Sequence, residues 1–92
     1  MAELKVSNPE RVALTLACLE KNEAAVLAAL AAGASAYDGL LMCIAWPAGF
    51  DLVLTRSTPK DRVRFCARSG AADDARMRVE AYARRERLRG ML

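Results

Sequence analysis

A chain of 92 residues and 10.0 kDa has room for one small domain, so we expect residues 1–92 to fold as a single unit and exclude a multidomain enzyme. Its 54% apolar and 27% charged residues are typical of a folded protein and not of a disordered chain. Histidine is absent, which removes the commonest general base and the commonest zinc ligand. We therefore expect a protein that is not an enzyme and that binds no cofactor.

The net charge of +3 is unevenly distributed along the chain. Residues 1–54 carry a net charge of −3, whereas residues 55–92 carry a net charge of +6. Such asymmetry indicates that the basic half faces something acidic. Nucleic acid, a membrane surface, an acidic partner protein and the acidic half of a second copy all remain open.

The cysteines Cys18, Cys43 and Cys66 are odd in number and widely spaced, so they do not form the complete disulfide framework of a small secreted domain. They also lack the close pairs of a metal site, and we expect buried, reduced thiols. The first ten residues contain no apolar core of signal-peptide length, and no apolar stretch approaches the roughly 18 to 20 residues needed to cross a bilayer. We therefore expect a cytoplasmic protein that does not insert into a membrane.

The first half of the chain contains two helix signals. Ser7-Asn8-Pro9-Glu10 combines a capping side chain, an early proline and an acid, and predicts a helix from about Pro9 to Lys21. A second helix begins at Glu23 and ends at Gly33, with Asn22 marking the turn between the two. Its many alanines would let a neighbouring helix approach closely. The buried stripe predicted for the first helix consists of Val12, Leu16 and Leu19, with Ala13 and Cys18 alongside.

The middle of the chain predicts shorter elements. The segment 38–46 is nearly all apolar and indicates a short buried helix, which Pro47 and Gly49 then break. The segment 50–55 is compatible with a helix or a strand, and helix is favoured because a lone strand would have no evident partner.

Two further helices are expected in the basic half. Ser57-Thr58-Pro59 predicts a helix over 59–68, and Asp73 and Asp74 begin a helix that reaches about Leu88. The side chains expected to face inward are Val63, Cys66 and Ala67 in the first and Ala75, Val79 and Tyr82 in the second, with Arg62, Arg64 and Arg68 on the outside of the first. The pairs at the favourable four-residue spacing are Asp74–Arg78 and Glu80–Arg84.

The three cysteines also suggest an internal repeat. They lie 25 and 23 residues apart, and each is followed four residues later by a turn-forming residue: Asn22, Pro47 and Gly70. The repeated unit would be a helical hairpin. Chance alignment in a short chain is the competing explanation.

Residues 14–35 resemble one ankyrin repeat, whose two helices end in a glycine–alanine pair. The matching positions are Leu14, Leu16, Ala17, Val26, Leu30, Gly33 and Ala34. The threonine–proline–leucine–histidine start is missing, and the spacing is shorter than the family's period of about 33 residues. The resemblance implies an all-α array of consecutive short helical hairpins that binds proteins, with an unrelated small helical bundle as the alternative.

Aromatic and basic residues supply the candidate binding site. Phe50 is expected in the core. Tyr37 and Trp46 flank the central break and either complete the core or are candidate anchors for a partner. We expect an electrostatic rim from the arginines of the last helix, namely Arg78, Arg84, Arg85 and Arg87.

The predicted function is non-catalytic protein binding, as an adaptor or as a small subunit of a larger assembly. A protein partner with an acidic surface is favoured, and a homo-oligomer is possible. The first alternative is a small nucleic-acid-binding regulator that uses the last helix, although Asp73, Asp74 and Glu80 would repel phosphates there. The second is an inhibitor or immunity-type protein that binds one enzyme. The high alanine and arginine content is typical of a GC-rich bacterial genome.

Overall fold

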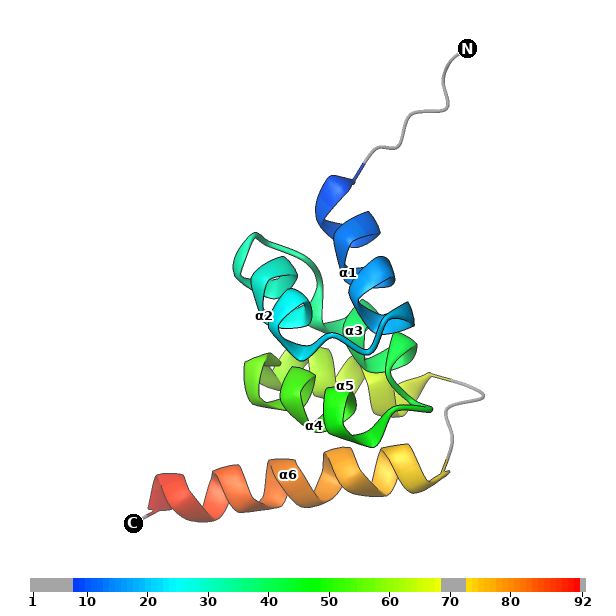
Figure 1. The fold of residues 1–92 in the computed structure, drawn as a ribbon. Helices are drawn as coiled ribbons and strands as arrows, with labels where there is room; N and C mark the ends of the chain where they lie inside the picture. Colours follow the sequence, from blue (N-terminus) through cyan, green and yellow to red (C-terminus); the bar gives the residue numbers. More distant parts are fainter. Residues whose placement is uncertain (1–7, 69–72, 92) are drawn as a thin grey trace.

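A computed structural model describes residues 8–68 and 73–91 (Figure 1). Those residues contain six helices and no strand, which confirms the predicted all-α class. The helices are α1 (Pro9–Leu19), α2 (Glu23–Ala31), α3 (Ala36–Met42), α4 (Pro47–Arg56), α5 (Pro59–Ala67) and α6 (Asp73–Met91).

Short polar side chains begin four of the helices. The side chains of Asn8, Asn22, Ser35 and Thr58 each accept a hydrogen bond from a backbone N–H of the first turn that follows. At Thr58 the bond is reciprocal, because the Asp61 carboxylate accepts from the Thr58 N–H at 3.0 Å. Asn22 therefore does more than mark a turn, since it caps α2.

Two predicted boundaries are wrong. The helix expected to end at Lys21 ends at Leu19, because Lys21 adopts a positive φ of 52°. The helix expected over 38–46 ends at Met42, and Pro47 begins α4 instead of breaking an element. Proline is well tolerated there, since the N–H it lacks has no partner in a first turn.

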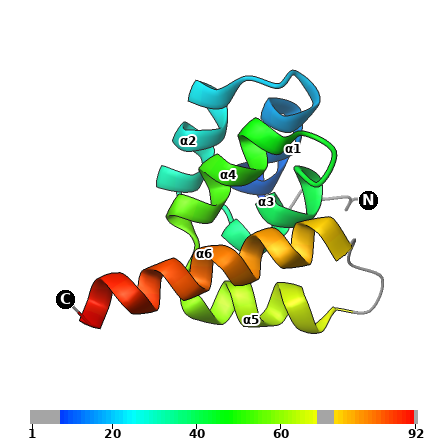
Figure 2. The same ribbon diagram turned by 90° about the horizontal axis from the view of Figure 1, so that it is seen from below.

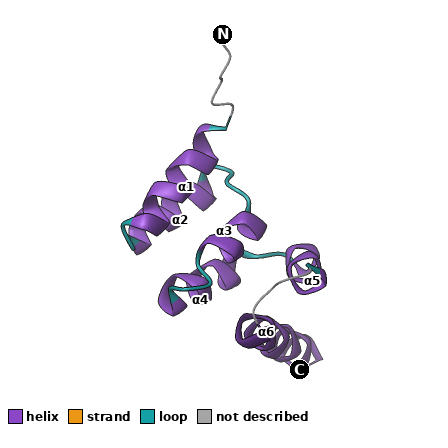
Figure 3. Ribbon diagram, turned by 90° about the vertical axis from the view of Figure 1, so that its right-hand side faces the viewer, coloured by secondary structure: helices purple, strands orange, loops and turns teal. Residues whose placement is uncertain are grey.

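The helices pair in the order of the chain. The contacts join α1 with α2, α3 with α4, and α5 with α6, and Figure 3 shows these pairs one after another. Neighbouring pairs also touch. The first helix of the middle pair, α3, contacts the first helices of the other two pairs, α1 and α5, and the second helices α2 and α4 contact each other. Seen from below in Figure 2, α6 runs alongside α5, and its C-terminal end projects beyond the other helices. The fold is a stack of three helical pairs.

The core follows this stack. The first helices bury Leu14, Leu40 and Phe65, and the second helices bury Val26, Val53 and Val79, all at 0–1% exposure. Phe50 is buried as predicted, and its ring meets that of Phe65 edge-on, with centroids 5.8 Å apart and planes at 64°. The predicted inner stripe of α6 is also confirmed, because Ala75 and Val79 are buried and Tyr82 packs against the core.

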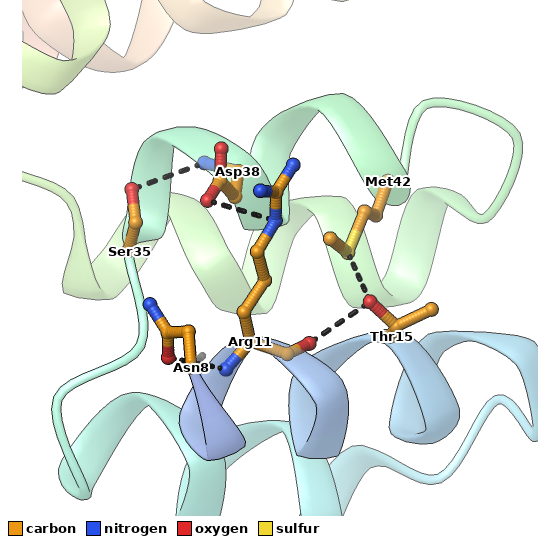
Figure 4. A network of polar contacts seen from close by, with 6 residues as sticks. All are labelled: Asn8, Arg11, Thr15, Ser35, Asp38 and Met42. Carbon is orange, nitrogen blue, oxygen red and sulfur yellow. Dashed lines mark hydrogen bonds and ion pairs between the residues drawn. The ribbon is translucent and has the colours of Figure 1, made fainter. Parts of the chain in front are cut away.

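Polar contacts hold α1 against α3 at the edge of the stack (Figure 4). The Arg11 Nε atom lies 3.6 Å from a carboxylate oxygen of Asp38, whose own N–H donates to the Ser35 hydroxyl. One turn further along, the Thr15 hydroxyl donates to the Arg11 carbonyl at 2.9 Å and lies 3.7 Å from the Met42 sulfur. These contacts fix the register of the two helices.

The predicted buried stripe of α1 is wrong. Val12, Leu16 and Leu19 are 44%, 52% and 75% exposed, and Leu14 and Ala17 are buried instead. Both sets recur at three- and four-residue steps, so either could form an inner stripe. The set with the small Ala17 faces inward, and its small side chain lets α2 approach closely.

The inward face of α5 also differs from the prediction. Phe65 fills the core, so Val63, two residues away, is 70% exposed, whereas Arg62 shares the Phe65 face and is buried. The Arg62 guanidinium donates to the carbonyl and hydroxyl oxygens of Ser57, each at 3.0 Å, and lies 5.1 Å from the centroid of the Tyr82 ring. A buried cation thus supports the α4–α5 turn.

The end of α2 depends on a glycine. Gly33 adopts a φ of +114°, which side chains rarely tolerate, although nothing lies within 4 Å of an added Cβ. We expect Gly33→Ala to lower the free energy of unfolding by about 1 kcal/mol through backbone strain alone. Gly90→Ala, also in open space but without a positive φ, should leave stability unchanged or slightly raised. Urea unfolding measures the stability of both variants. Equal stabilities would show that the positive φ of Gly33 does not make alanine unfavourable there.

Candidate protein-binding surface

Tyr37 lies inside the stack and is not presented to a partner. It is 7% exposed on α3, and the Arg64 guanidinium lies 4.0 Å from its ring centroid. Its hydroxyl accepts a hydrogen bond from Arg68 at 3.4 Å. Of the two roles expected for Tyr37, the structure therefore favours the core, because its ring joins α3 to α5.

Trp46 is half-buried at the start of α4. Its N–H donates to the Cys43 carbonyl at 2.9 Å, and its own carbonyl accepts from the Phe50 N–H. The indole lies directly over Gly49, where an added Cβ would overlap the six-membered ring, and it packs against the core. Trp46 is therefore only partly exposed, and the position of its ring depends on a glycine that sequence reasoning treated only as a break.

The predicted arginines do not form one cluster. Arg78 Nη1 lies 2.9 Å from a carboxylate oxygen of Asp51 on α4, so its charge is neutralised within the molecule. Arg85 lies 6.0 Å from the Tyr82 ring centroid and, with Arg78, lines a cleft of about 330 Å³ between α4 and α6. Arg84 and Arg87 are exposed near the C-terminal end of α6. The candidate residues thus occupy three separate places: Tyr37 between α3 and α5, Trp46 at the start of α4, and the arginines along α6.

Sequence reasoning missed the exposed apolar face of α1. We name this the α1 face and define it by Val12, Leu16 and Leu19, which lie on one side of the helix at 44%, 52% and 75% exposure. The available signal was that α1 carries two apolar stripes, whereas a helix at the end of a stack needs only one for its own core. The second stripe has no covering element among the described residues.

A shallow cleft adjoins the α1 face. Its volume is about 420 Å³, and it lies between α1 and α2. Ala13, on its rim, is one turn from Leu16 on the same helix. The remaining lining residues are Pro9, Glu10, Ala25, Ala28, Ala29 and Ala32. The alanine-rich side of α2, expected to receive a neighbouring helix, is thus partly open beside an apolar stripe.

Two thiols, those of Cys43 and Cys66, have a pKa above the ordinary value for cysteine. The Sγ atoms of Cys18 and Cys43 are 3.3 Å apart where α1 meets α3. Burial, followed by the hydrogen bond and the charge of Cys18, raises the pKa of Cys43 from its ordinary value of 9.0 to about 12. Burial also raises the pKa of Cys66, with Glu80 raising and Arg76 lowering it.

Residues 8–68 and 73–91 contain neither a metal-binding cluster nor a membrane-spanning helix. No group of three or more cysteine, aspartate or glutamate side chains there could hold a metal ion. No helix in this part of the chain is long and apolar enough to span a bilayer.

Comparison with known proteins yields no relative: no family model matches the chain, and no curated protein or solved structure matches it either.

Replacing Gly49 tests the placement of Trp46. In Gly49→Ala the new Cβ overlaps the indole, so we expect the ring to swing outward and stability to fall by about 1–3 kcal/mol. Trp46 is the sole tryptophan, so its fluorescence should shift to longer wavelength and become easier to quench with acrylamide. Gly90→Ala is the matched control. Unchanged emission in Gly49→Ala would show that the indole does not rest on this glycine.

The raised pKa of Cys43 predicts an alkaline loss of stability. Between pH 9 and about 12 the folded state holds a proton that the unfolded state releases, so stability falls as pH rises, by up to about 1.4 kcal/mol per pH unit. The contribution is complete below pH 9. Urea unfolding from pH 8 to 10.5 under reducing conditions should show a shallower decline in Cys43→Ala than in the native chain. An identical decline in both proteins would show that the Cys43 thiol does not cause the alkaline loss of stability.

Proposed function

We propose that the chain is a non-catalytic protein-binding module and that the α1 face is its main contact surface. The observation that carries this proposal is the exposure of Val12, Leu16 and Leu19 on one side of a helix whose other side is already packed. Contiguous apolar patches on small proteins commonly mark interaction sites, because water is released when a partner covers them.

The shape of the surface favours a helical partner. The α1 face is a ridge of large side chains, and the adjoining cleft of about 420 Å³ is lined mostly by alanines. An amphipathic helix could place its apolar residues against the ridge and into the cleft. The polar residues Thr15 and Glu20 are exposed beside the ridge and would form the hydrated rim of such an interface.

The end of α6 supplies a second, electrostatic surface. Arg84 and Arg87 are exposed there, and this part of the helix projects beyond the stack (Figure 2). An acidic protein surface would be attracted to it, mainly with a faster association rate. Trp46 remains a candidate contact because the residue is only partly buried.

The likeness of residues 14–35 to an ankyrin repeat supports the same proposal. The buried leucine or phenylalanine of each first helix and the buried valine of each second helix recur about every 26 residues, as expected of stacked repeats. We propose a degenerate ankyrin-like array, acting as an adaptor or small subunit in the cytoplasm. An inhibitor or immunity-type role would use the same surface.

Nucleic-acid binding is the second candidate function, favoured by the exposed arginines at the end of α6. Against it, Asp51 neutralises Arg78, and Asp73 and Asp74 are exposed in the first turn of the same helix. Affinity for a duplex that falls steeply with salt would support this candidate, and no shift at low salt would exclude it.

Charge substitution on α1 tests the protein-binding proposal. The chain is purified from its own host with bound companions, and its mass is measured by light scattering. We expect a stoichiometric companion, or a second copy, that is lost in Leu16→Asp and Leu19→Asp because a buried carboxylate opposes association. Both variants should keep the stability of the native chain within about 0.5 kcal/mol, since the sites are exposed.

Val63→Asp is the matched control, because Val63 is 70% exposed on α5 and lies outside the α1 face. It should retain the companion. A companion that survives both α1 substitutions, but is released by Arg84→Glu with Arg87→Glu, would move the contact surface to α6. A monomer without any companion would refute the proposal.

A further inference from the structure

Two cysteines from different helical pairs are in direct contact. Cys18 on α1 and Cys43 after α3 are 25 residues apart in sequence, yet their Sγ atoms are separated by only 3.3 Å. A disulfide needs a separation of about 2.05 Å, so a shift of little more than 1 Å would join them.

Both cysteines lie at helix ends, where helices fray more readily than in their middle turns. Cys18 is the penultimate residue of α1, and Cys43 is the C-terminal cap of α3. The neighbouring contacts of Arg11 with Asp38 and of Thr15 with Met42 hold the same two helices in register (Figure 4). The two thiols are therefore held close to each other by contacts that do not involve the cysteine sulfurs.

The two thiols differ in accessibility. Cys43 is fully buried, whereas Cys18 is only partly buried. A reagent would meet Cys18 first, and Cys43 lies directly behind it. This is the arrangement of an attacking thiol with a resolving thiol.

We propose that Cys18 and Cys43 form a reversible disulfide by exchange with a low-molecular-weight disulfide. The Cys18 thiolate attacks one sulfur of the reagent, so that a mixed disulfide forms, the reagent's S–S bond breaks and one thiolate leaves. Cys43 then gives its proton to a thiolate released from the reagent and attacks the Cys18 sulfur, which forms the internal bond and releases the second thiolate. The two cysteines are oxidised, and one molecule of reagent is reduced to two thiols.

The bond would tie the first helical pair to the second. It closes a loop of 25 residues and crosslinks α1 to α3, so it restricts the unfolded chain. For a domain of this size we expect the melting temperature to rise on the order of 5–15 °C. Because α1 also carries the α1 face, oxidation would fasten that surface to the stack. The disulfide itself does not depend on the protein-binding proposal.

Oxidised glutathione is the probe for this site. The reduced full-length chain is incubated with it at pH 8, quenched with an alkylating reagent and analysed by intact mass and peptide mapping. We expect a monomer that has lost two hydrogen atoms, with the Cys18 and Cys43 peptides linked and both thiols restored by dithiothreitol. Cys66, on α5, should instead be alkylated or carry a glutathione adduct.

Three variants make the outcome decisive. Cys66→Ser should form the internal bond and show the full rise in melting temperature. Cys18→Ser and Cys43→Ser should show neither, and far-ultraviolet circular dichroism of the reduced proteins confirms that each is folded. The proposal is overturned if Cys66 is one of the paired residues, if the bond joins two chains, or if Cys18 and Cys43 stay reduced while Cys66 is modified.

Discussion

The structure depends on a continuous row of buried side chains that every helix enters. Five of the six helices have only 7 to 11 residues, and helices of that length are unstable alone in water. Leu14, Leu40 and Phe65 on one side meet Val26, Val53 and Val79 on the other, so each short helix is stabilised by its neighbours. Gly39 permits part of this contact, because an added Cβ would lie 3.0 Å from Val53. Loss of one helix from the row would expose the apolar faces of the next.

This constraint also determines what the protein shows to solvent. α1 has two apolar stripes, but the row accepts only Leu14 and its small neighbour Ala17, so the stripe with Val12 and Leu16 is left outside. Nothing in the local sequence forces that choice, since either stripe fits a 3.6-residue period. The packing of α2 and α3 decides which stripe of α1 faces inward. Both helices must approach α1 closely, and the small side chain of Ala17 allows that approach. The exposed face is thus a consequence of how the stack is packed.

The same reasoning explains how far sequence analysis reached. Helix starts were predictable at Asn8-Pro9 and Thr58-Pro59, because capping and proline act within a few residues. The inner face of α6 was predictable because Ala75, Val79 and Tyr82 follow one another at steps of four and three residues in an otherwise mostly charged helix. The burial of Arg62 and Tyr37 was not, because each is held by a partner from another element, the α4–α5 turn for Arg62 and α5 for Tyr37. Pro47 was misread because a proline that breaks one helix and a proline that begins the next have the same local signature.

The charge asymmetry takes on a different meaning in the folded chain. Part of it is satisfied internally, since Asp51 from the acidic half pairs with Arg78 from the basic half at 2.9 Å. The remaining exposed arginines lie at the end of α6, whereas the α1 face lies at the opposite end of the stack, with α3, α4 and α5 between them (Figure 1). A compact partner would therefore contact only one of these surfaces. An extended partner, or two different partners, could use the apolar contact at one end for affinity and the basic contact at the other for steering.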